Sequence, residues 1–246
     1  MKLAAKTDIG LGRAENQDTY RAARLPGGGV WALVCDGMGG ARGGKAAAES
    51  AADAVQQEFA AGEQACPPGE EQAFLLSALR AANAQVYRQA QRSPANRGMG
   101  TTAVCVLVRD GVAHLAHVGD SRAYLYRDCE IRQLTRDHSV VQEMVERGAI
   151  TRAEAAVHPR KNIIPRALGV EPAVEPEYTS RTVCPGDILL LCTDGLTGPL
   201  RDESMAAVLA NAPFLAVPEV LIQKALAAGG QDNITAVLIG VEDGEG

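Results

Sequence analysis

VWALVCDGMGGARGG, at residues 30–44, joins an apolar run to an acidic residue and a glycine-rich turn. The apolar run VWALVC is typical of a short buried strand that ends in a turn. It leads directly into Asp36, and a carboxylate at the end of a buried strand is costly unless a partner such as a metal ion neutralises it. The glycines that follow let backbone groups approach the same point closely. We therefore expect a cation-binding turn here if other acidic residues converge on Asp36.

The composition of the chain limits the classes of fold and partner. Its 246 residues, 46% of them hydrophobic, are enough to bury a large core as one domain or two small ones. Because aromatic residues make up only 4%, we expect a core of Ala, Val, Leu and Ile. The formal net charge of −6 argues against nucleic acid or an anionic membrane surface as the main partner. The N-terminus has no apolar signal-peptide core and no run approaches the ~18 apolar residues of a membrane span, so a cytoplasmic protein is expected.

The cysteines indicate a reducing compartment. Cys35, Cys105 and Cys192 lie within apolar, strand-like runs. No pair of cysteines has the CxxC spacing, which argues against a zinc ribbon or a thioredoxin-like motif. Buried free thiols are the simplest interpretation.

Short strands separated by turns dominate the middle and the end of the chain. The patterns predict helices at 45–60, 70–91, 138–148, 151–157, 204–211 and 217–228, and strands at 30–35, 101–108, 112–118, 123–126, 130–134, 187–192 and 234–241. Because short connections cannot hold a parallel crossover, the strands are expected to pair antiparallel. There is no internal repeat and no linker-like segment. One α/β domain with mainly antiparallel sheets and outer helices is therefore predicted.

Acidic residues follow several of the apolar runs. Asp36 follows VWALVC, Asp194 follows ILLLCT, and Asp232 immediately precedes the final strand. If these strands are neighbours, the three carboxylates converge on one edge of the sheet, and Asp18 and Asp120 are candidates for the same cluster. Oxygen ligands without His or Cys select a hard cation such as Mg²⁺ or Mn²⁺. Each Asp-Gly pair taken alone is better explained as a simple turn, but the repeated context after buried strands favours a metal cluster.

Other motifs give weaker signals. His114 and His117 are three residues apart on a predicted strand and so point to opposite faces, which argues against a shared zinc site. His138 lies at a predicted helix start near the acidic cluster. Ser121 lacks the G-x-S-x-G context of a nucleophile, and the glycine run lacks the GK[ST] ending of a P-loop.

Arg13 has two interpretations. As an arginine five residues before Asp18, it is suited to bind a phosphate beside the metals with two parallel hydrogen bonds. A surface ion pair with Glu15 explains its position equally well.

Eight motifs, in order along the chain, resemble one protein family. They are RAENQD (13–18), VCDGMGG (34–40), GMGTTAV (98–104), VGDSRAYL (118–125), LTRDHSVVQEMVERGAIT (134–151), HPRKNIIPRALG (158–169), PGDILLLCTDGLT (185–197) and GGQDNITAVLI (229–239). Together they resemble the metal-dependent protein serine/threonine phosphatases (type 2C, or PPM), and in particular the small bacterial members. The resemblance covers nearly the whole chain.

The resemblance implies both a fold and a metal centre. The implied fold is α+β, a four-layer α-β-β-α sandwich of two antiparallel sheets flanked by helices, with residues 1–246 as a single phosphatase domain and the metal cleft at one end. By similarity, Asp36 would bridge two Mn²⁺ or Mg²⁺ ions. The backbone carbonyl of Gly37 would complete the first ion, and Asp194 and Asp232 would hold the second.

Further roles follow from the same resemblance. Asp18 would act mainly through metal-bound water, and Asp120 matches the position that binds a weaker third ion in bacterial members. Arg13 would hold the substrate phosphate and so share the catalytic role with Asp36. The segment at 138–158 corresponds to the family's mobile flap beside the cleft.

The resemblance also implies a reaction and its partners. A hydroxide bridging the two ions would hydrolyse phosphoserine and phosphothreonine in proteins. The implied partners are phosphorylated proteins and a cognate bacterial Hanks-type Ser/Thr kinase with its substrates, and the enzyme is expected to be a monomer that contacts neither nucleic acid nor membrane. Two alternatives are an inactive relative that only binds phosphoproteins and a two-metal phosphohydrolase acting on small molecules.

Some positions depart from the family pattern. Ala41 stands where bacterial members usually have His, and Gly198 stands where an Asp often supplies a ligand to the third ion. Pro165 replaces a common Thr and should stiffen its loop. Met38 occupies the place of a His thought to be the general acid in animal relatives, so the leaving group has no evident side-chain proton donor.

Overall fold

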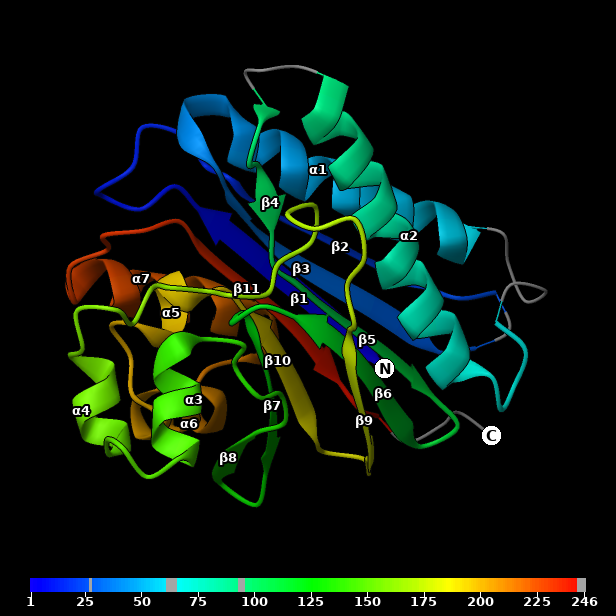
Figure 1. The fold of residues 1–246 in the computed structure, drawn as a ribbon. Helices are drawn as coiled ribbons and strands as arrows, with labels where there is room; N and C mark the ends of the chain where they lie inside the picture. The colour runs from blue at the N-terminus through cyan, green and yellow to red at the C-terminus, as the bar shows by residue number, and fades with distance from the viewer. Residues whose placement is uncertain (27, 61–65, 93–95, 243–246) are drawn as a thin grey trace.

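Two antiparallel sheets pack face to face, and helices cover the outer face of each (Figure 1). The computed structural model describes residues 1–26, 28–60, 66–92 and 96–242, with the backbone alone at 40–42. The four-layer α-β-β-α sandwich expected from the sequence is confirmed. In the described part of the chain, no helix combines the length and the apolarity needed to cross a bilayer.

The first sheet carries the strand that ends at Asp36. Its order is β2-β3-β5-β6-β9, and β4 adds to the end of β3. The bounds are β2 (Asp18–Arg24), β3 (Val30–Met38), β4 (Gly100–Thr101), β5 (Ala103–Arg109), β6 (Val112–Val118) and β9 (Glu177–Thr182).

The second sheet carries the strands next to Asp194 and Asp232. Its order is β1-β11-β10-β7-β8, with every neighbouring pair antiparallel. The bounds are β1 (Lys2–Asp8), β7 (Arg122–Arg127), β8 (Glu130–Gln133), β10 (Ile188–Cys192) and β11 (Ile234–Gly240).

The helices form the two outer layers and one peripheral segment (Figure 1). One layer, on the first sheet, consists of α1 (Gly40–Ala60) and α2 (Glu71–Arg92). The other, on the second sheet, consists of α5 (Asp194–Thr197), α6 (Asp202–Asn211) and α7 (Val217–Ala227), with a 3-10 turn at Phe214–Ala216. The short helices α3 (Val140–Glu146) and α4 (Arg152–Ala156) lie in the segment that was expected to be the flap.

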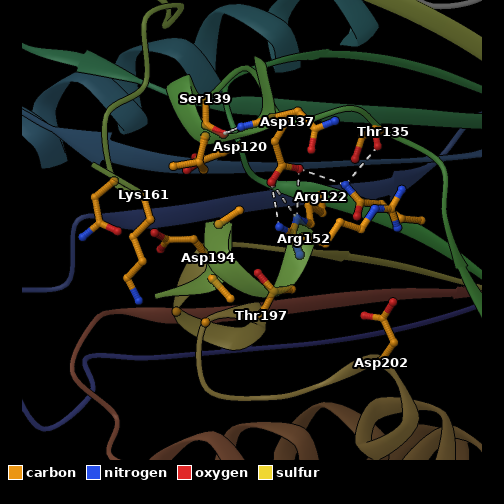
Figure 2. Close-up of a pocket in the computed structure, with 18 of the residues that line it drawn as sticks. Asp120, Arg122, Thr135, Asp137, Ser139, Arg152, Lys161, Asp194, Thr197 and Asp202 are labelled. Carbon is orange, nitrogen blue, oxygen red and sulfur yellow. Dashed lines mark hydrogen bonds and ion pairs between the residues drawn. The ribbon is translucent and has the colours of Figure 1, made fainter. Parts of the chain in front are cut away.

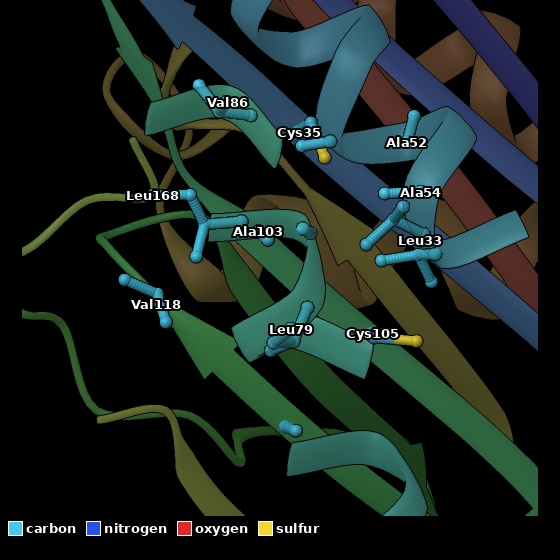
Figure 3. Packing of buried hydrophobic residues seen from close by; sticks show 14 of the residues in the cluster. Leu33, Cys35, Ala52, Ala54, Leu79, Val86, Ala103, Cys105, Val118 and Leu168 are labelled. Atoms are coloured by element: carbon cyan, nitrogen blue, oxygen red, sulfur yellow. The ribbon is translucent and has the colours of Figure 1, made fainter. Parts of the chain in front are cut away.

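Strand β3 is buried on both faces, which explains its unbroken apolar run. Leu33 and Cys35 pack toward α1 and α2, whereas Ala32 and Val34 pack into the core between the sheets. This alternation is the two-residue period of a strand. Small side chains such as Ala52 let α1 lie close to the sheet (Figure 3). The alternation fixes the direction of β3, so its last residues emerge at one end of the sandwich.

Every predicted helix and strand is present within a few residues of its expected bounds. The structure adds strands β1, β2 and β9, the single turn of α5 and the 3-10 turn at Phe214–Ala216, where the sequence patterns gave no such prediction. The helix predicted from residue 138 begins at Val140, because the Ser139 side chain accepts a hydrogen bond from the Gln142 amide and caps it. The described cysteines are all free thiols, with Cys35, Cys105 and Cys192 buried as expected.

Candidate active site

Asp36 and Asp18 face each other across two neighbouring strands. In the register of β2 and β3 the two residues are direct partners. The backbone of Asp36 is fixed by Thr102, whose Oγ1 accepts from the Asp36 amide at 2.9 Å and whose amide donates to the Asp36 carbonyl at 2.9 Å. Thr101 Oγ1 donates to the same carbonyl at 2.9 Å. These bonds hold the carboxylate of Asp36 at the end of the first sheet.

Asp18 also links the first sheet to the second. One oxygen of its carboxylate, Oδ2, accepts hydrogen bonds from Thr193 Oγ1 at 2.8 Å and from Thr235 Oγ1 at 2.7 Å. Thr193 is the residue before Asp194, and Thr235 lies at the start of β11. Because both hydroxyls donate to Asp18, the position of Asp194 is coupled to the end of β2.

Asp232 and the N-terminal loop are held together by Asn233. The Asn233 Oδ1 accepts from the Gln17 amide at 2.8 Å, and its Nδ2 donates to the carbonyls of Ile9, at 2.8 Å, and Glu15, at 3.1 Å. This buried side chain therefore places the loop at 9–17 against the start of β11.

Arg13, which the loop carries, binds an acidic residue of the candidate site. Its Nη2 donates to Asp232 Oδ2 at 2.7 Å. The acidic partner of Arg13 is thus Asp232 and not Glu15, whose carboxylate lies 3.9 Å from Lys45. The pair is half exposed, so it adds little to stability. The pair does place the positively charged guanidinium of Arg13 at the edge of the acidic cluster.

Asp120 lies in the turn between β6 and β7. Gly119 before it has a positive φ of 102°, and a Cβ at that position would lie 2.6 Å from Thr102 Cγ2. Ser121 after it shares a hydrogen bond with Thr102 through their hydroxyls at 2.7 Å. Thr102 therefore contacts both neighbours of Asp120 and the backbone of Asp36.

Burial, and then the neighbouring carboxylates, raise the pKa values of Asp18, Asp36, Asp120 and Asp194. Burial, followed by the charges of Asp194 and Asp232, raises the pKa of Asp18 to about 7 despite its two threonine donors. Burial and the charges of Asp194 and Asp137 raise the pKa of Asp120 to about 8. The pKa of Asp36 is well above its ordinary value and that of Asp194 is also raised, in both cases by burial first and then by neighbouring carboxylates.

The unpaired oxygens of this cluster fit a cation. Among the described residues, Asp18 Oδ1, Asp120 Oδ1 and Asp194 Oδ1 are buried without a hydrogen-bond partner. A divalent ion would satisfy these oxygens and offset both the burial and the repulsion that raise the pKa values. Because every donor is a carboxylate, the set suits Mg²⁺ or Mn²⁺ rather than zinc.

A groove of about 1070 Å³ runs from this cluster along the α3–α4 segment. Asp120, Asp194 and Asp232 line one part of it, and Arg152 and Lys161 lie on the α3–α4 side. Figure 2 shows Asp120 and Asp194 facing the groove. The groove is large enough for an extended segment of another chain as well as for a small phosphorylated molecule.

The structure thus brings together Asp18, Asp36, Asp120, Asp194 and Asp232. Gly37 is buried beside them and packs so tightly that a Cβ would lie 2.1 Å from the Gly44 carbonyl oxygen. The lack of room for a side chain explains why residue 37 is glycine. That its backbone carbonyl binds a metal ion stays a prediction.

Neutral side chains that the sequence interpretation passed over hold the acids in place. Thr102, Thr193, Thr235 and Asn233 each bond to an acidic residue or to the chain beside it. Thr193, Thr235 and Asn233 each lie within three residues of an aspartate in the sequence. Thr102 has no such neighbour, and only the pairing of β4 and β5 with β3 brings it to Asp36. His138 does not contact the cluster of aspartates; it forms hydrogen bonds with Gly119 and Glu177.

Comparisons with known proteins agree at the levels of sequence and fold. The family model described as Protein phosphatase 2C matches residues 12–237. The chain is 41% identical over 251 residues to the serine/threonine protein phosphatase PstP of Mycobacterium tuberculosis, covering 99% of this chain and 45% of that protein. A serine/threonine phosphatase structure from S. agalactiae has a TM-score of 0.92 and 36% identity, covering 98% of this chain and 99% of that chain. The structure of the PstP catalytic domain in complex with two manganese ions has a TM-score of 0.86 and 37% identity, covering 98% of each chain.

Proposed function

The chain belongs to the protein phosphatase 2C family, and from this we propose that it is a metal-dependent protein serine/threonine phosphatase. The observation that carries the proposal is the convergence of five aspartates: three of them, Asp18, Asp120 and Asp194, have a buried oxygen without a partner, and the pKa values of these three and of Asp36 are raised. Family membership and the relative solved with two manganese ions support a metal-dependent chemistry for this cluster. The chain spans 45% of the mycobacterial relative, so we propose activity for residues 1–246 as one phosphatase domain.

We propose that Asp36, Asp194 and Asp232 hold two Mn²⁺ or Mg²⁺ ions together with the Gly37 carbonyl, and that Asp120 holds a third. Such ions would lower the pKa of a water molecule and so make it a nucleophile. Their positive charge would also stabilise the negative charge on the phosphoryl oxygens. The protein's own contribution is to align the carboxylates and to favour their charged form. The hydroxyls of Thr193 and Thr235 do so at Asp18, because a hydrogen bond to a carboxylate favours its charged form.

Arg13 would bind the substrate phosphate. Its guanidinium now contacts one oxygen of Asp232 and is half exposed, so it can turn toward a ligand in the groove. A phosphoryl group matches the guanidinium fork with two parallel hydrogen bonds. Met38, at the end of β3, has no proton to donate, so the seryl or threonyl leaving group would take its proton from water.

The partners follow from the same proposal. Phosphorylated proteins are the substrates, a Hanks-type kinase makes them, and the phosphatase acts as a monomer. The free thiols support a reducing, cytoplasmic location.

Phosphate release from a phosphothreonine peptide tests the proposal. The protein should release phosphate from the peptide with Mn²⁺ or Mg²⁺ and lose this activity in EDTA. A nucleoside monophosphate should be a poor substrate. Asp194→Asn is the matched inactive variant, because it keeps the size of the side chain and removes its charge. Peptide turnover that survives metal stripping, or hydrolysis of the nucleotide alone, would contradict the proposal.

A further inference from the structure

Two hydrogen bonds join His138 to the turn that carries Asp120. Its backbone amide donates to the Gly119 carbonyl at 2.9 Å, and its Nδ1 accepts from the Gly119 amide at 3.2 Å. Both polar backbone groups of one residue are thus bound by one histidine. Since Gly119 immediately precedes Asp120, the hydrogen bonds of His138 restrict the direction in which the Asp120 carboxylate leaves the turn.

The imidazole of His138 is itself held on two sides. Its ring stacks on His117 with centroids 4.7 Å apart, and its Nε2 lies 3.2 Å from Glu177 Oε2. His117 is fixed in turn, because its Nε2 lies 2.8 Å from the Arg136 carbonyl. His138 is 5% exposed, and burial and the neighbouring His117 lower its pKa to about 4. The ring is therefore neutral at pH 7, with Nε2–H donating to Glu177 and Nδ1 free to accept from Gly119.

The other side of the Asp120 turn is held by Thr102. The Ser121 hydroxyl bonds to Thr102 Oγ1, and the same Oγ1 accepts from the Asp36 amide. Asp120 thus sits between two fixed neighbours, Gly119 bound by His138 and Ser121 bound by Thr102. Its own Oδ1 has no hydrogen-bond partner among the described residues, so its direction depends on those neighbours.

A cation is a poor explanation for the histidine cluster. His117, His138 and Glu177 offer ligand atoms within 4.8 Å of one another, as a metal site would. However, both nitrogens of His138 already have partners, and Arg166 Nη1 lies 3.4 Å from its Nε2. Arg136 Nη1 also lies 3.8 Å from Glu177 Oε2. Two guanidinium groups disfavour a divalent ion here, so the cluster is a hydrogen-bonded support.

We propose that His138 is a positioning residue that fixes the Asp120 carboxylate through Gly119. The inference rests on the proposed function in one respect, namely that Asp120 binds a metal ion. His138 does not touch the substrate. Its effect on the reaction passes through the backbone of the turn.

Two substitutions separate the two ends of the imidazole. In His138→Asn, Oδ1 stands close to the place of Nδ1, so the acceptor for the Gly119 amide is kept and the bond to Glu177 is lost. In His138→Gln, the amide reaches toward Glu177 and no acceptor stands at the place of Nδ1. A merely structural role would make both variants fail alike.

Hydrogen exchange of the Gly119 amide in EDTA gives the first readout. Loss of one hydrogen bond should speed exchange about tenfold in His138→Gln and leave His138→Asn near the wild-type rate. Equal exchange in the wild type and His138→Gln would overturn the proposal. This readout needs no metal and no substrate.

Calorimetric titration with Mn²⁺ gives the second readout. Loss of a supporting group outside the ligand set should weaken the weakest Mn²⁺ site about tenfold in His138→Gln, and His138→Asn should restore it. In an Asp120→Asn background, His138→Gln should change Mn²⁺ binding no further. Equal weakening by both histidine variants, or a full effect of His138→Gln without Asp120, would overturn the proposal. If the wild type binds no Mn²⁺, the proposed function fails, and the exchange of the Gly119 amide alone decides the role of His138.

Discussion

Asp18→Asn should stabilise the protein in EDTA, and increasingly so as the pH rises. The pKa of the buried Asp18 carboxyl is raised from 3.8 to about 7, chiefly by burial. A difference of about three in pKa corresponds to about 4 kcal/mol, the cost of ionising this group in the folded state relative to the unfolded chain. The Asn Oδ1 can still accept from Thr193 and Thr235, and its amide can occupy the place of the unpaired Oδ1.

The sign of the pH dependence follows from proton binding. Between the pKa of the unfolded chain and that of the folded protein, the folded state binds more protons, so the free energy of unfolding falls as the pH rises. This contribution of Asp18 is fully present below pH ~4 and is lost as the pH rises through about 7. Asparagine does not titrate. The advantage of the variant should therefore grow from near zero at pH ~4 to about 4 kcal/mol above pH ~7.

Urea unfolding in EDTA at pH values of about 5, 6.5 and 8 measures this difference directly. The matched control is Asp53→Asn, an exposed carboxylate on α1 paired with Arg21, which should change the free energy of unfolding by less than about 1 kcal/mol at every pH. If Asp18→Asn is less stable than the wild type at the highest pH, or its advantage is the same at all three, the raised pKa of Asp18 in the metal-free protein is wrong.

Three further variants test the site. Arg13→Ala should lower kcat/KM about ten- to a hundredfold, partly through KM, while Glu15→Ala changes it little; steady-state kinetics on a phosphothreonine peptide would refute this if KM and kcat are both unchanged. Asp194→Asn should lose most turnover at saturating Mn²⁺ with unchanged circular dichroism, and near-wild-type turnover would exclude it as a ligand. Asn233→Ala should lower the free energy of unfolding by about 2–4 kcal/mol, because it leaves buried backbone groups unpaired; a loss below about 0.5 kcal/mol would show that the loop is held otherwise.

The buried strands could be predicted because their environment dictates their composition. A strand covered on both faces, such as β3 or β10, has an unbroken apolar run. The strands that escaped prediction lie at sheet edges. β2, DTYRAAR, and β9, EYTSRT, are each paired on one side only and carry polar side chains along most of their length. Their strand state depends on partners far away in the sequence, which no local pattern reveals.

The acidic site could be predicted for a different reason. A carboxylate directly after an apolar run needs a partner, so Asp36 and Asp194 were conspicuous in the sequence. The threonine and asparagine residues that hold these carboxylates were not conspicuous, because a neutral side chain after an apolar run does not need a charged partner. Thr193 and Thr235 are 175 and 217 residues from Asp18, and only the pairing of the strands brings them to it. The same holds for Arg13, whose contact with Asp232 crosses 219 residues and replaces the local pair with Glu15.

Anomalous diffraction from crystals soaked in Mn²⁺ tests the central claim most directly. We predict two strong peaks about 3.5–4 Å apart that share Asp36 as a ligand, with Asp194 and Asp232 on one of them. Peaks that avoid Asp36 would contradict it, as would manganese bound only at His117, His138 and Glu177.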